Sequence, residues 1–170
     1  MNQNINIVWL KRDLRITDHA PLQAAIRAGQ PTILLFCFEP SLMVHPNYDV
    51  RHWRFFWESL EDMQAALKPY GCQVLICHNE VLPVLQTLQE KYDIQQIFSH
   101  QETGVKLTFD RDVAVKKFCR NNSIEWQEYD QDGVIRGLKN RKDWVQYWRK
   151  VITTQAMVKV EMSNFQSFEP

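Results

Sequence analysis

The sequence lacks any long apolar run and any excess of one charge. No stretch approaches the ~20 consecutive apolar residues that a membrane-spanning helix needs, and the N-terminus lacks the basic-then-apolar pattern of a signal peptide. The chain has 20 basic and 20 acidic side chains, so its total charge does not indicate a strongly cationic nucleic-acid binder. We therefore expect a cytoplasmic protein that makes no membrane contact.

The motifs of several common enzyme classes are also absent. No Gly-x-Gly-x-x-Gly follows the first predicted strand, and no Gly-Lys-Ser/Thr phosphate loop occurs, which argues against ordinary dehydrogenases and P-loop proteins. The nucleophile elbow of hydrolases and the His-Glu-x-x-His helix of zinc proteases are missing too. The five histidines are scattered, without the spacing typical of a zinc site.

The four cysteines contain no Cys-x-x-Cys pair. They are Cys37, Cys72, Cys77 and Cys119. Three of them lie in or beside strand or helix patterns, where a small apolar thiol packs well. We interpret the four as reduced core cysteines rather than as a metal or redox site.

What the sequence does contain is a regular alternation of strand and helix patterns. At 170 residues, with 45% hydrophobic and 24% charged residues, the chain fits one ordered domain. Apolar runs predict strands at 5–10, 32–38, 72–77, 124–129 and a shorter fourth one that closes at Ser99 and His100. Amphipathic spacing predicts helices between them. This order implies βαβ units and a parallel sheet, an α/β fold.

Capping residues set the expected helix boundaries. Asp18 is the predicted N-cap of a helix over 19–28, and Gly29 stands at its C-cap. The second helix runs from Arg51 to Gly71, and Asn79 is the predicted cap of the third. Residues 39–50 form a loop longer than is usual in such folds, and long loops at strand ends often carry function.

Polar side chains gather where the predicted strands end, the edge at which open parallel sheets bind ligands. They are Lys11, Arg12, Asp13 and Arg15 after the first strand, Arg51 and His52 at the head of the second helix, His78 and His100 at the ends of the third and fourth strands, and Glu102 beyond. A carboxylate such as Glu102 can accept two N–H bonds from the ureido edge of a pterin, flavin or deazaflavin ring. Alternatively, these side chains cap helices and pair with one another, as Glu102 would with Lys106.

Three stretches resemble one family. "VWLKRDLRITDHAPL" at the start, "RHWRFFWESLEDMQAAL" in the second helix, and "SHQETG" followed by "TFDRDVAV" are similar to segments of the DNA photolyase and cryptochrome family. This resemblance implies a Rossmann-like three-layer sandwich with a five-stranded parallel sheet in the order 3-2-1-4-5. It also implies that residues 1–152 are an N-terminal antenna-binding domain, and that 153–170 begin a linker towards a C-terminal FAD-binding domain.

The resemblance further implies a function and a set of site residues. A deoxyribodipyrimidine photolyase, a carbon-carbon lyase, repairs damaged DNA with FAD, and this domain would hold an antenna chromophore: a folate, a deazaflavin or a flavin. The cofactor-binding residues implied are Glu102, Arg51, Phe38, His100 and Arg12, and none is catalytic. A cryptochrome photoreceptor would share the domain. A stand-alone nucleotide-binding protein of the electron-transfer-flavoprotein or stress-protein type would usually show a glycine-rich phosphate loop.

Two further segments leave alternatives open. Trp53 and Phe56 have the spacing of core residues, whereas Phe55 or Trp57 could face a ring in the crevice. Residues 136–150 interleave basic side chains with Trp144, Tyr147 and Trp148. That stripe would suit contact with DNA phosphates and bases, but an amphipathic helix that packs its aromatic side chains inward explains it as well.

Overall fold

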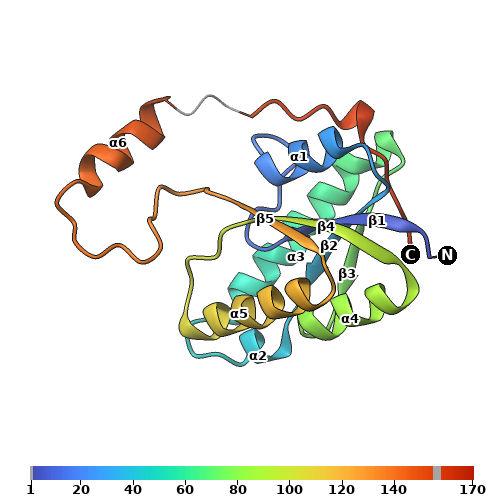
Figure 1. Cartoon of the computed structure of the whole chain (residues 1–170), viewed down its shortest axis with the longest axis horizontal. Helices are drawn as coiled ribbons and strands as arrows, with labels where there is room; N and C mark the ends of the chain where they lie inside the picture. Colours follow the sequence, from blue (N-terminus) through green and yellow to red (C-terminus); the bar gives the residue numbers. More distant parts are fainter. Residues whose placement is uncertain (1, 155–157) are drawn as a thin grey trace.

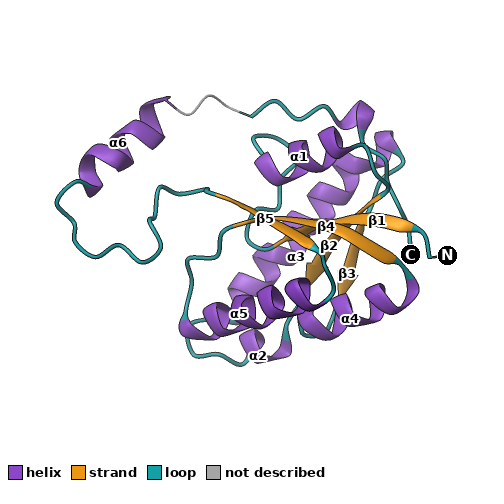
Figure 2. Cartoon of the chain, in the orientation of Figure 1, coloured by secondary structure: helices purple, strands orange, loops and turns teal. Residues whose placement is uncertain are grey.

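The computed structural model describes residues 2–154 and 158–170, and its centre is one parallel sheet. Five strands lie in the order β3-β2-β1-β4-β5, with helices on both faces (Figures 1 and 2). The predicted α/β class, three-layer arrangement and strand order are therefore confirmed. The strands are β1 (Asn4–Leu10), β2 (Thr32–Cys37), β3 (Val74–Cys77), β4 (Asp93–His100) and β5 (Glu125–Tyr129).

The helices connect successive strands. They are α1 (Ala20–Ala28), α2 (Pro40–Met43), α3 (Val50–Leu67), α4 (Val81–Lys91), α5 (Lys106–Asn121) and α6 (Trp144–Thr154), with short 3₁₀ turns η1 (Lys68–Tyr70) and η2 (Met162–Asn164). The short helix α2 lies in the segment that was expected to be loop. The second predicted helix ends at Leu67, and the 3₁₀ turn η1 follows it up to Gly71.

The central strand β1 is buried on both faces because its side chains alternate between two apolar cores. Ile5, Ile7 and Trp9 pack with α4 and α5 on one face. Val8 and Leu10 pack with α1 and α3 on the other. Both faces of the sheet are thus covered, and the loops at the strand ends are left as the place where polar groups can gather.

The predicted N-cap of α1 is wrong by one residue. His19 is the cap, and its Nδ1 accepts the backbone N–H of Leu22 at 3.1 Å. Asp18 lies just before it with φ of 49°, a left-handed conformation that Asp tolerates better than most residues. Its Oδ1 accepts the backbone N–H of Val158 instead, at 2.8 Å. The predicted C-cap Gly29 is confirmed, with φ of 65°.

Two further local predictions are wrong for tertiary reasons. Asn79 does not cap α4, whose N-cap is Glu80. The N–H of Val81 is accepted by Glu39 from the loop after β2, at 3.2 Å. The fourth strand is not short but has eight residues, because β4 pairs with β1 on one side and β5 on the other. Gln96 has register partners on both sides, Asn6 and Glu125, and Gln95 lies where the register with β1 shifts; neither side chain carries an apolar signal.

Residues 158–170 pack against the domain. Met162 and Phe165 are buried against the face of α1 and α3. The backbone N–H of Thr32 donates to Gln166 at 2.8 Å, and that of Phe168 donates to the carbonyl of Thr32 at 3.0 Å. The expected start of a linker is therefore anchored to the domain, by backbone bonds to Thr32 at the start of β2 and by the buried Met162 and Phe165. That this segment leads to a C-terminal FAD-binding domain stays a prediction.

Helix α6 stands apart from the three layers, at the end of a long excursion after β5 (Figure 1). The predicted amphipathic helix forms, but its aromatic side chains contact one another and the preceding loop rather than the sheet. Trp144 and Trp148 lie 6.4 Å apart between ring centroids, and Trp148 lies against Gly133. Direct DNA contact by this stripe stays a prediction.

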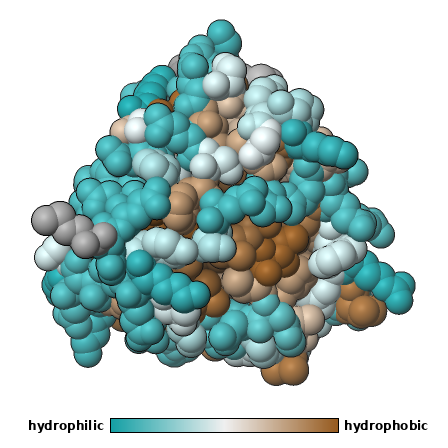
Figure 3. All heavy atoms as spheres, turned by 90° about the vertical axis from the view of Figure 1, so that its right-hand side faces the viewer, coloured by the Kyte–Doolittle hydropathy of each residue, from teal (hydrophilic) through white to brown (hydrophobic). Residues whose placement is uncertain are grey.

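The surface is not uniformly polar. On the side where both chain ends lie in Figure 1, apolar side chains line a hollow enclosed by polar ones (Figure 3).

Among residues 2–154 and 158–170, no helix combines the length and apolarity required to cross a membrane.

Candidate functional site

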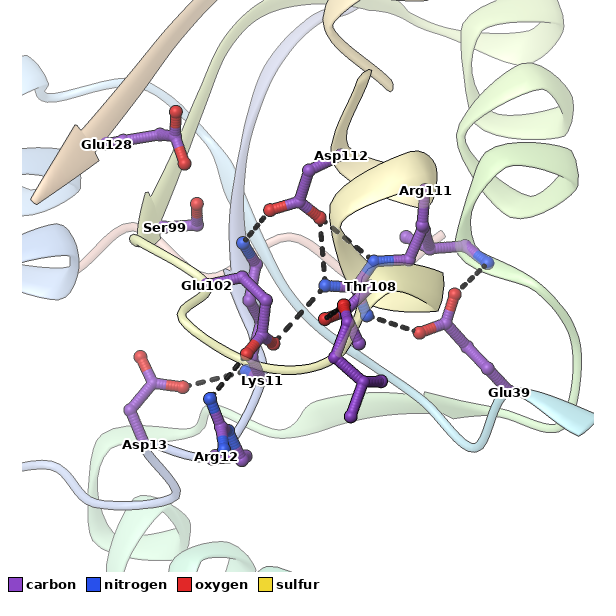
Figure 4. Close-up of polar contacts among 12 residues, drawn as sticks. Lys11, Arg12, Asp13, Glu39, Ser99, Glu102, Thr108, Arg111, Asp112 and Glu128 are labelled. Atoms are coloured by element: carbon purple, nitrogen blue, oxygen red, sulfur yellow. Dashed lines mark hydrogen bonds and ion pairs between the residues drawn. The ribbon is translucent and has the colours of Figure 1, made fainter. Parts of the chain in front are cut away.

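Charged side chains from four segments meet at the carboxyl ends of β1, β2 and β4. Lys11, Arg12 and Asp13 come from the loop after β1, Glu39 follows β2, Glu102 follows β4, and Arg111 and Asp112 lie on α5 (Figure 4). Because parallel strands end at one edge, residues up to 101 positions apart come into contact there. Of the polar side chains predicted at this edge, Lys11, Arg12, Asp13 and Glu102 lie together there.

Arg111 is the centre of this charged cluster. Its Nη1 donates to Glu39 at 2.6 Å, its Nε and Nη2 reach Asp112 at 3.0 and 2.9 Å, and Nη2 lies 3.4 Å from Glu102. Burial alone would lower the pKa of Arg111, but Glu39 and Asp112 outweigh it and raise that pKa. The guanidinium is therefore a fixed cation held by three carboxylates from three segments.

Lys11 is a second buried cation in the cluster. Its Nζ lies 3.1 Å from Asp112 and 4.2 Å from the centroid of the Trp9 ring, and Arg111 lies 4.7 Å from the same centroid. Burial lowers the pKa of Lys11, and the attraction of Asp112 opposes this shift. Trp9 thus supplies an electron-rich ring to two cations, which offsets part of their lost hydration.

Glu102 is held by two arginines and is nearly enclosed. Its side chain is 5% exposed, and it accepts from Arg12 and Arg111. Glu102 neither pairs with Lys106, which pairs with Asp110, nor caps α5, whose N-cap is Val105. Its contacts with Arg12 and Arg111 do fit the alternative that the charged side chains at this edge pair with one another. A Cβ at Gly104 would lie 2.7 Å from the Glu102 carboxylate, so this position requires glycine for the close approach.

Asp13 joins two histidines beside the charged cluster. Its Oδ2 lies 2.5 Å from His100 Nδ1 and 3.0 Å from His19 Nε2, the latter outside good hydrogen-bond alignment, while Oδ1 accepts the N–H of Lys11 at 2.7 Å. Burial alone would raise the pKa of Asp13, but the histidine contacts outweigh it and hold that pKa far below its usual range. All three side chains are buried.

The Asp13–His19–His100 group has the composition of a metal site, and its potential ligand atoms lie within 4.8 Å of one another. His19 Nδ1, however, accepts the Leu22 N–H, so the proton of the neutral ring lies on Nε2, the atom that faces Asp13. A protonated nitrogen cannot bind a metal ion. The arrangement therefore favours a structural role in which Asp13 accepts from the loop and from His100 and lies beside His19.

A small cavity lies between the charged cluster and an aromatic wall. It is lined on one side by Arg12, Glu39, Glu102 and Arg111. On the other side Tyr48 stacks on Trp53, with ring centroids 5.0 Å apart and 24° between the planes. The cavity measures about 30 Å³, room for a water molecule but not for a chromophore ring while Tyr48 stays in this position.

Trp53 carries an unused donor at this wall. Its Nε1 is buried and has no hydrogen-bond partner among the residues that the structure describes. Buried N–H groups almost always have a partner, so an orphaned one at a cavity points to an acceptor supplied by a ligand or by water. Trp53 thus lines the same cavity as two arginines and two carboxylates and carries that unpartnered donor.

The structure brings some of the predicted residues together and leaves others apart. Arg12 and Glu102 meet at the cavity, and His100 is tied to Asp13. Phe38 packs on Phe36, Trp53 and Trp57 behind the wall. Arg51 is 81% exposed, pairs with Asp49 and is not among the lining residues.

Sequence reasoning missed Tyr48, Trp53 and Arg111 as site residues. Trp53 had been assigned to the core by its helical spacing, and Tyr48 lies in a loop without periodicity. For Arg111 a signal existed, since Asp110, Arg111 and Asp112 form a charged run near the start of the helix after Glu102.

Comparison with known proteins identifies the family of this chain. The model of the DNA photolyase family matches residues 6–153 of this chain. Cryptochrome DASH of Xenopus laevis is 25% identical over 166 residues, which cover 90% of this chain and 32% of that protein. Cryptochrome DASH of Gloeobacter violaceus is 27% identical over 119 residues, which cover 66% of this chain and 24% of that protein.

Solved structures share the fold. A Synechocystis sp. PCC6803 cryptochrome aligns with a TM-score of 0.80 at 17% identity, over 95% of this chain and 37% of that one. An archaeal photolyase from Sulfolobus tokodaii, solved with two FAD molecules, aligns with a TM-score of 0.72 at 22% identity, over 92% and 36% of the two chains. The chain thus spans about a quarter to a third of the length of the curated relatives it matches.

Proposed function

The chain belongs to the DNA photolyase family, and we propose that it is the antenna-binding N-terminal domain of a longer light-dependent flavoprotein. Its relatives are three to four times as long as the segment they share with it, as the covered shares of 24% and 32% imply. In this proposal the FAD and the reacting centre belong to a C-terminal domain. The domain described here binds and places a second chromophore.

The orphaned Nε1 of Trp53 is the observation that carries this proposal. A flat heteroaromatic ring that replaced Tyr48 on the Trp53 face would gain a stacking partner. Because the indole N–H lies in the indole plane, Nε1 would donate to a part of the ligand beyond the edge of the indole and not to the stacked ring itself. The Glu102 carboxylate, now held by Arg12 and Arg111, would accept ring N–H groups. When bound, the chromophore supplies light absorption, and the protein supplies position, orientation and exclusion of water.

An absorption titration tests this assignment. The purified chain is titrated with a reduced folate, a flavin and a deazaflavin, and the near-ultraviolet and visible spectrum is followed. We expect one of the three to bind with a shifted band and to bind more weakly to Trp53→Phe, which keeps the ring face and loses the N–H. Unshifted spectra for all three, with this chain and with the full-length protein, would contradict an antenna role.

Glu102→Gln gives a second, quantitative check. We predict that it weakens chromophore binding by ~1.5–3 kcal/mol, the usual worth of a hydrogen bond to a charged group, or about 10- to 150-fold in Kd. Glu58→Gln is the matched control, because Glu58 is exposed on α3 and lies outside the cavity. Circular dichroism at the titration temperature verifies that both variants are folded. Equal affinity of Glu102→Gln and wild type would remove Glu102 from the site.

For the full-length protein we propose light-driven repair of pyrimidine dimers as the reaction, with FAD in the C-terminal domain and damaged DNA as substrate. A cryptochrome-type photoreceptor is the second candidate, because the curated relatives reported above are cryptochromes. The assay is an oligonucleotide carrying one cyclobutane dimer, incubated with the reduced full-length protein under near-ultraviolet light. Loss of the dimer favours the lyase, and an intact dimer together with a light-dependent flavin spectrum favours the photoreceptor.

A further inference from the structure

Two cysteines end neighbouring strands of the sheet. Cys37 is the last residue of β2 and Cys77 the last residue of β3, and the two are register partners in the parallel ladder. Both side chains belong to the face covered by α4 and α5. In-register residues on adjacent strands lie roughly 4.8 Å apart, within the Cα separation of about 4.4–6.8 Å that a disulfide spans.

The two thiols have different surroundings. Cys37 is buried, whereas Cys77 is half-buried. The neighbouring Cys37 thiol lowers the pKa of Cys77 to about 7, although burial opposes the shift. The same contact raises the pKa of Cys37. The direction of these shifts favours the thiolate, the form that attacks disulfides, at Cys77 over Cys37.

The other two cysteines provide an internal contrast. Cys72 and Cys119 are buried, and burial raises the pKa of both thiols, that of Cys119 to about 11. Neither has a register partner that is a cysteine. All four cysteines are free, and Cys37 and Cys77 also belong to the apolar core, as expected from the sequence; only these two lie beside another cysteine.

We propose that Cys37 and Cys77 are a thiol–disulfide exchange site that takes low-molecular-weight disulfides such as oxidised glutathione. The Cys77 thiolate attacks one sulfur of the reagent, and the first glutathione leaves as a thiolate that is then protonated. Cys37 gives up its proton and attacks the Cys77 sulfur of the mixed disulfide, and the second glutathione leaves. Two protein thiols are oxidised to one disulfide, and one glutathione disulfide is reduced to two thiols.

The Cys37–Cys77 disulfide would be easily reduced and would lie next to the cavity at the charged cluster. Side chains of in-register neighbours stand near the strand spacing of roughly 4.8 Å, wider than the Cβ separation of about 3.8 Å that a disulfide prefers, so closing it strains the strand ends. Strained disulfides are the labile ones. Cys37 lines the cavity and is followed by Phe38, whose N–H donates to Cys77 at 2.8 Å, and by Glu39, which holds Arg111. Cys37 and Cys77 are thus linked, through Phe38 and Glu39, to the charged cluster at the cavity.

Mass spectrometry on the full chain tests the proposal. The protein is incubated with oxidised glutathione, denatured in acid, and alkylated at its free thiols. We expect two alkylated cysteines in place of four, a peptide linking Cys37 to Cys77, and full recovery of four thiols after dithiothreitol. Cys119→Ser is the control and should form the same linked peptide as wild type.

Single substitutions separate the two steps. Cys37→Ser should stop at a glutathione adduct on Cys77, since the resolving thiol is gone. Cys77→Ser should remain unmodified over the same time. Four alkylated thiols after treatment of the wild type, or a linkage through Cys72 or Cys119, would overturn the proposal. None of these readouts depends on an antenna chromophore.

Discussion

Asp13 is the residue on which the loop after β1 depends most directly. Its carboxylate accepts the N–H of Lys11 in its own loop and contacts His100 at the end of β4 and His19 at the cap of α1. It is 1% exposed, so water cannot replace a lost partner. The contacts that hold its pKa down therefore contribute directly to folding stability.

We predict that Asp13→Asn lowers the free energy of unfolding by ~2–4 kcal/mol. The amide keeps an oxygen for the Lys11 N–H but loses the charge and places N–H groups against a histidine, and breaking buried charged partners costs several kcal/mol. Urea unfolding followed by circular dichroism measures the change. The control is Asp110→Asn, which breaks an exposed pair with Lys106 and should cost less than about 1 kcal/mol. Equal losses in the two variants would refute a special role for Asp13.

At the scale of single residues, the sequence predicted which kinds of side chain lie at the strand ends better than it predicted which individual residues line the cavity. Arg12 and Glu102 were identified because they follow strand ends, and strand ends converge in any parallel sheet. Arg111 was missed because its position depends on how α5 packs back over the edge, which no local pattern reports. The exposure of Arg51 likewise depends on the direction in which the first turn of α3 points.

At the scale of elements, hydrophobic periodicity was sufficient for the five strands and for the helices between them. Caps were predicted less well, because a cap depends on which partner reaches the helix end. Glu39 caps α4 from a segment 42 residues away, and Asp18 serves the C-terminal segment rather than α1. The strand order came from the family resemblance, since alternation alone does not specify which strands are neighbours.

The C-terminal segment offers the clearest test at this scale. We predict that Met162→Ala lowers the free energy of unfolding by ~2 kcal/mol or more, because Met162 is 4% exposed and large-to-small changes in a core cost about 2–5 kcal/mol. Met43→Ala is the matched control, since Met43 is 36% exposed and should change stability by less than about 1 kcal/mol.

Hydrogen exchange distinguishes a docked segment from a free one. The Thr32 amide donates to Gln166 in the segment, so its protection should fall in Met162→Ala and stay unchanged in Met43→Ala. A stability loss in Met162→Ala no larger than in Met43→Ala, with Thr32 equally protected in both, would show that residues 158–170 behave as an unattached linker.

For the molecule as a whole, the cluster of buried charges makes stability depend on pH in two opposing ways. The pKa of Asp13 is held down in the folded state, so its contribution is present above the unfolded value of about 3.9 and is lost as pH falls below it. Burial raises the pKa of Glu39 even though Arg111 opposes the shift. Glu39 therefore takes up a proton more readily in the folded state, and its contribution changes in the opposite direction over the same range.

Comparing variants separates these contributions. We predict that the difference in unfolding free energy between wild type and Asp13→Asn is nearly constant from about pH 7 to pH 5 and shrinks progressively towards about pH 3. Over the acid range Asp13 of the wild type binds a proton in the unfolded state but not in the folded state, which destabilises the wild type. Asp13→Asn has no carboxylate at this position and lacks this effect. Glu39→Gln should show the reverse sign, becoming less stable relative to wild type as the pH falls. Urea titrations at fixed ionic strength measure both differences. A difference for Asp13→Asn that stays constant down to pH 3 would mean that this carboxylate titrates alike in the folded and unfolded chain, and that its histidine contacts do not stabilise the fold.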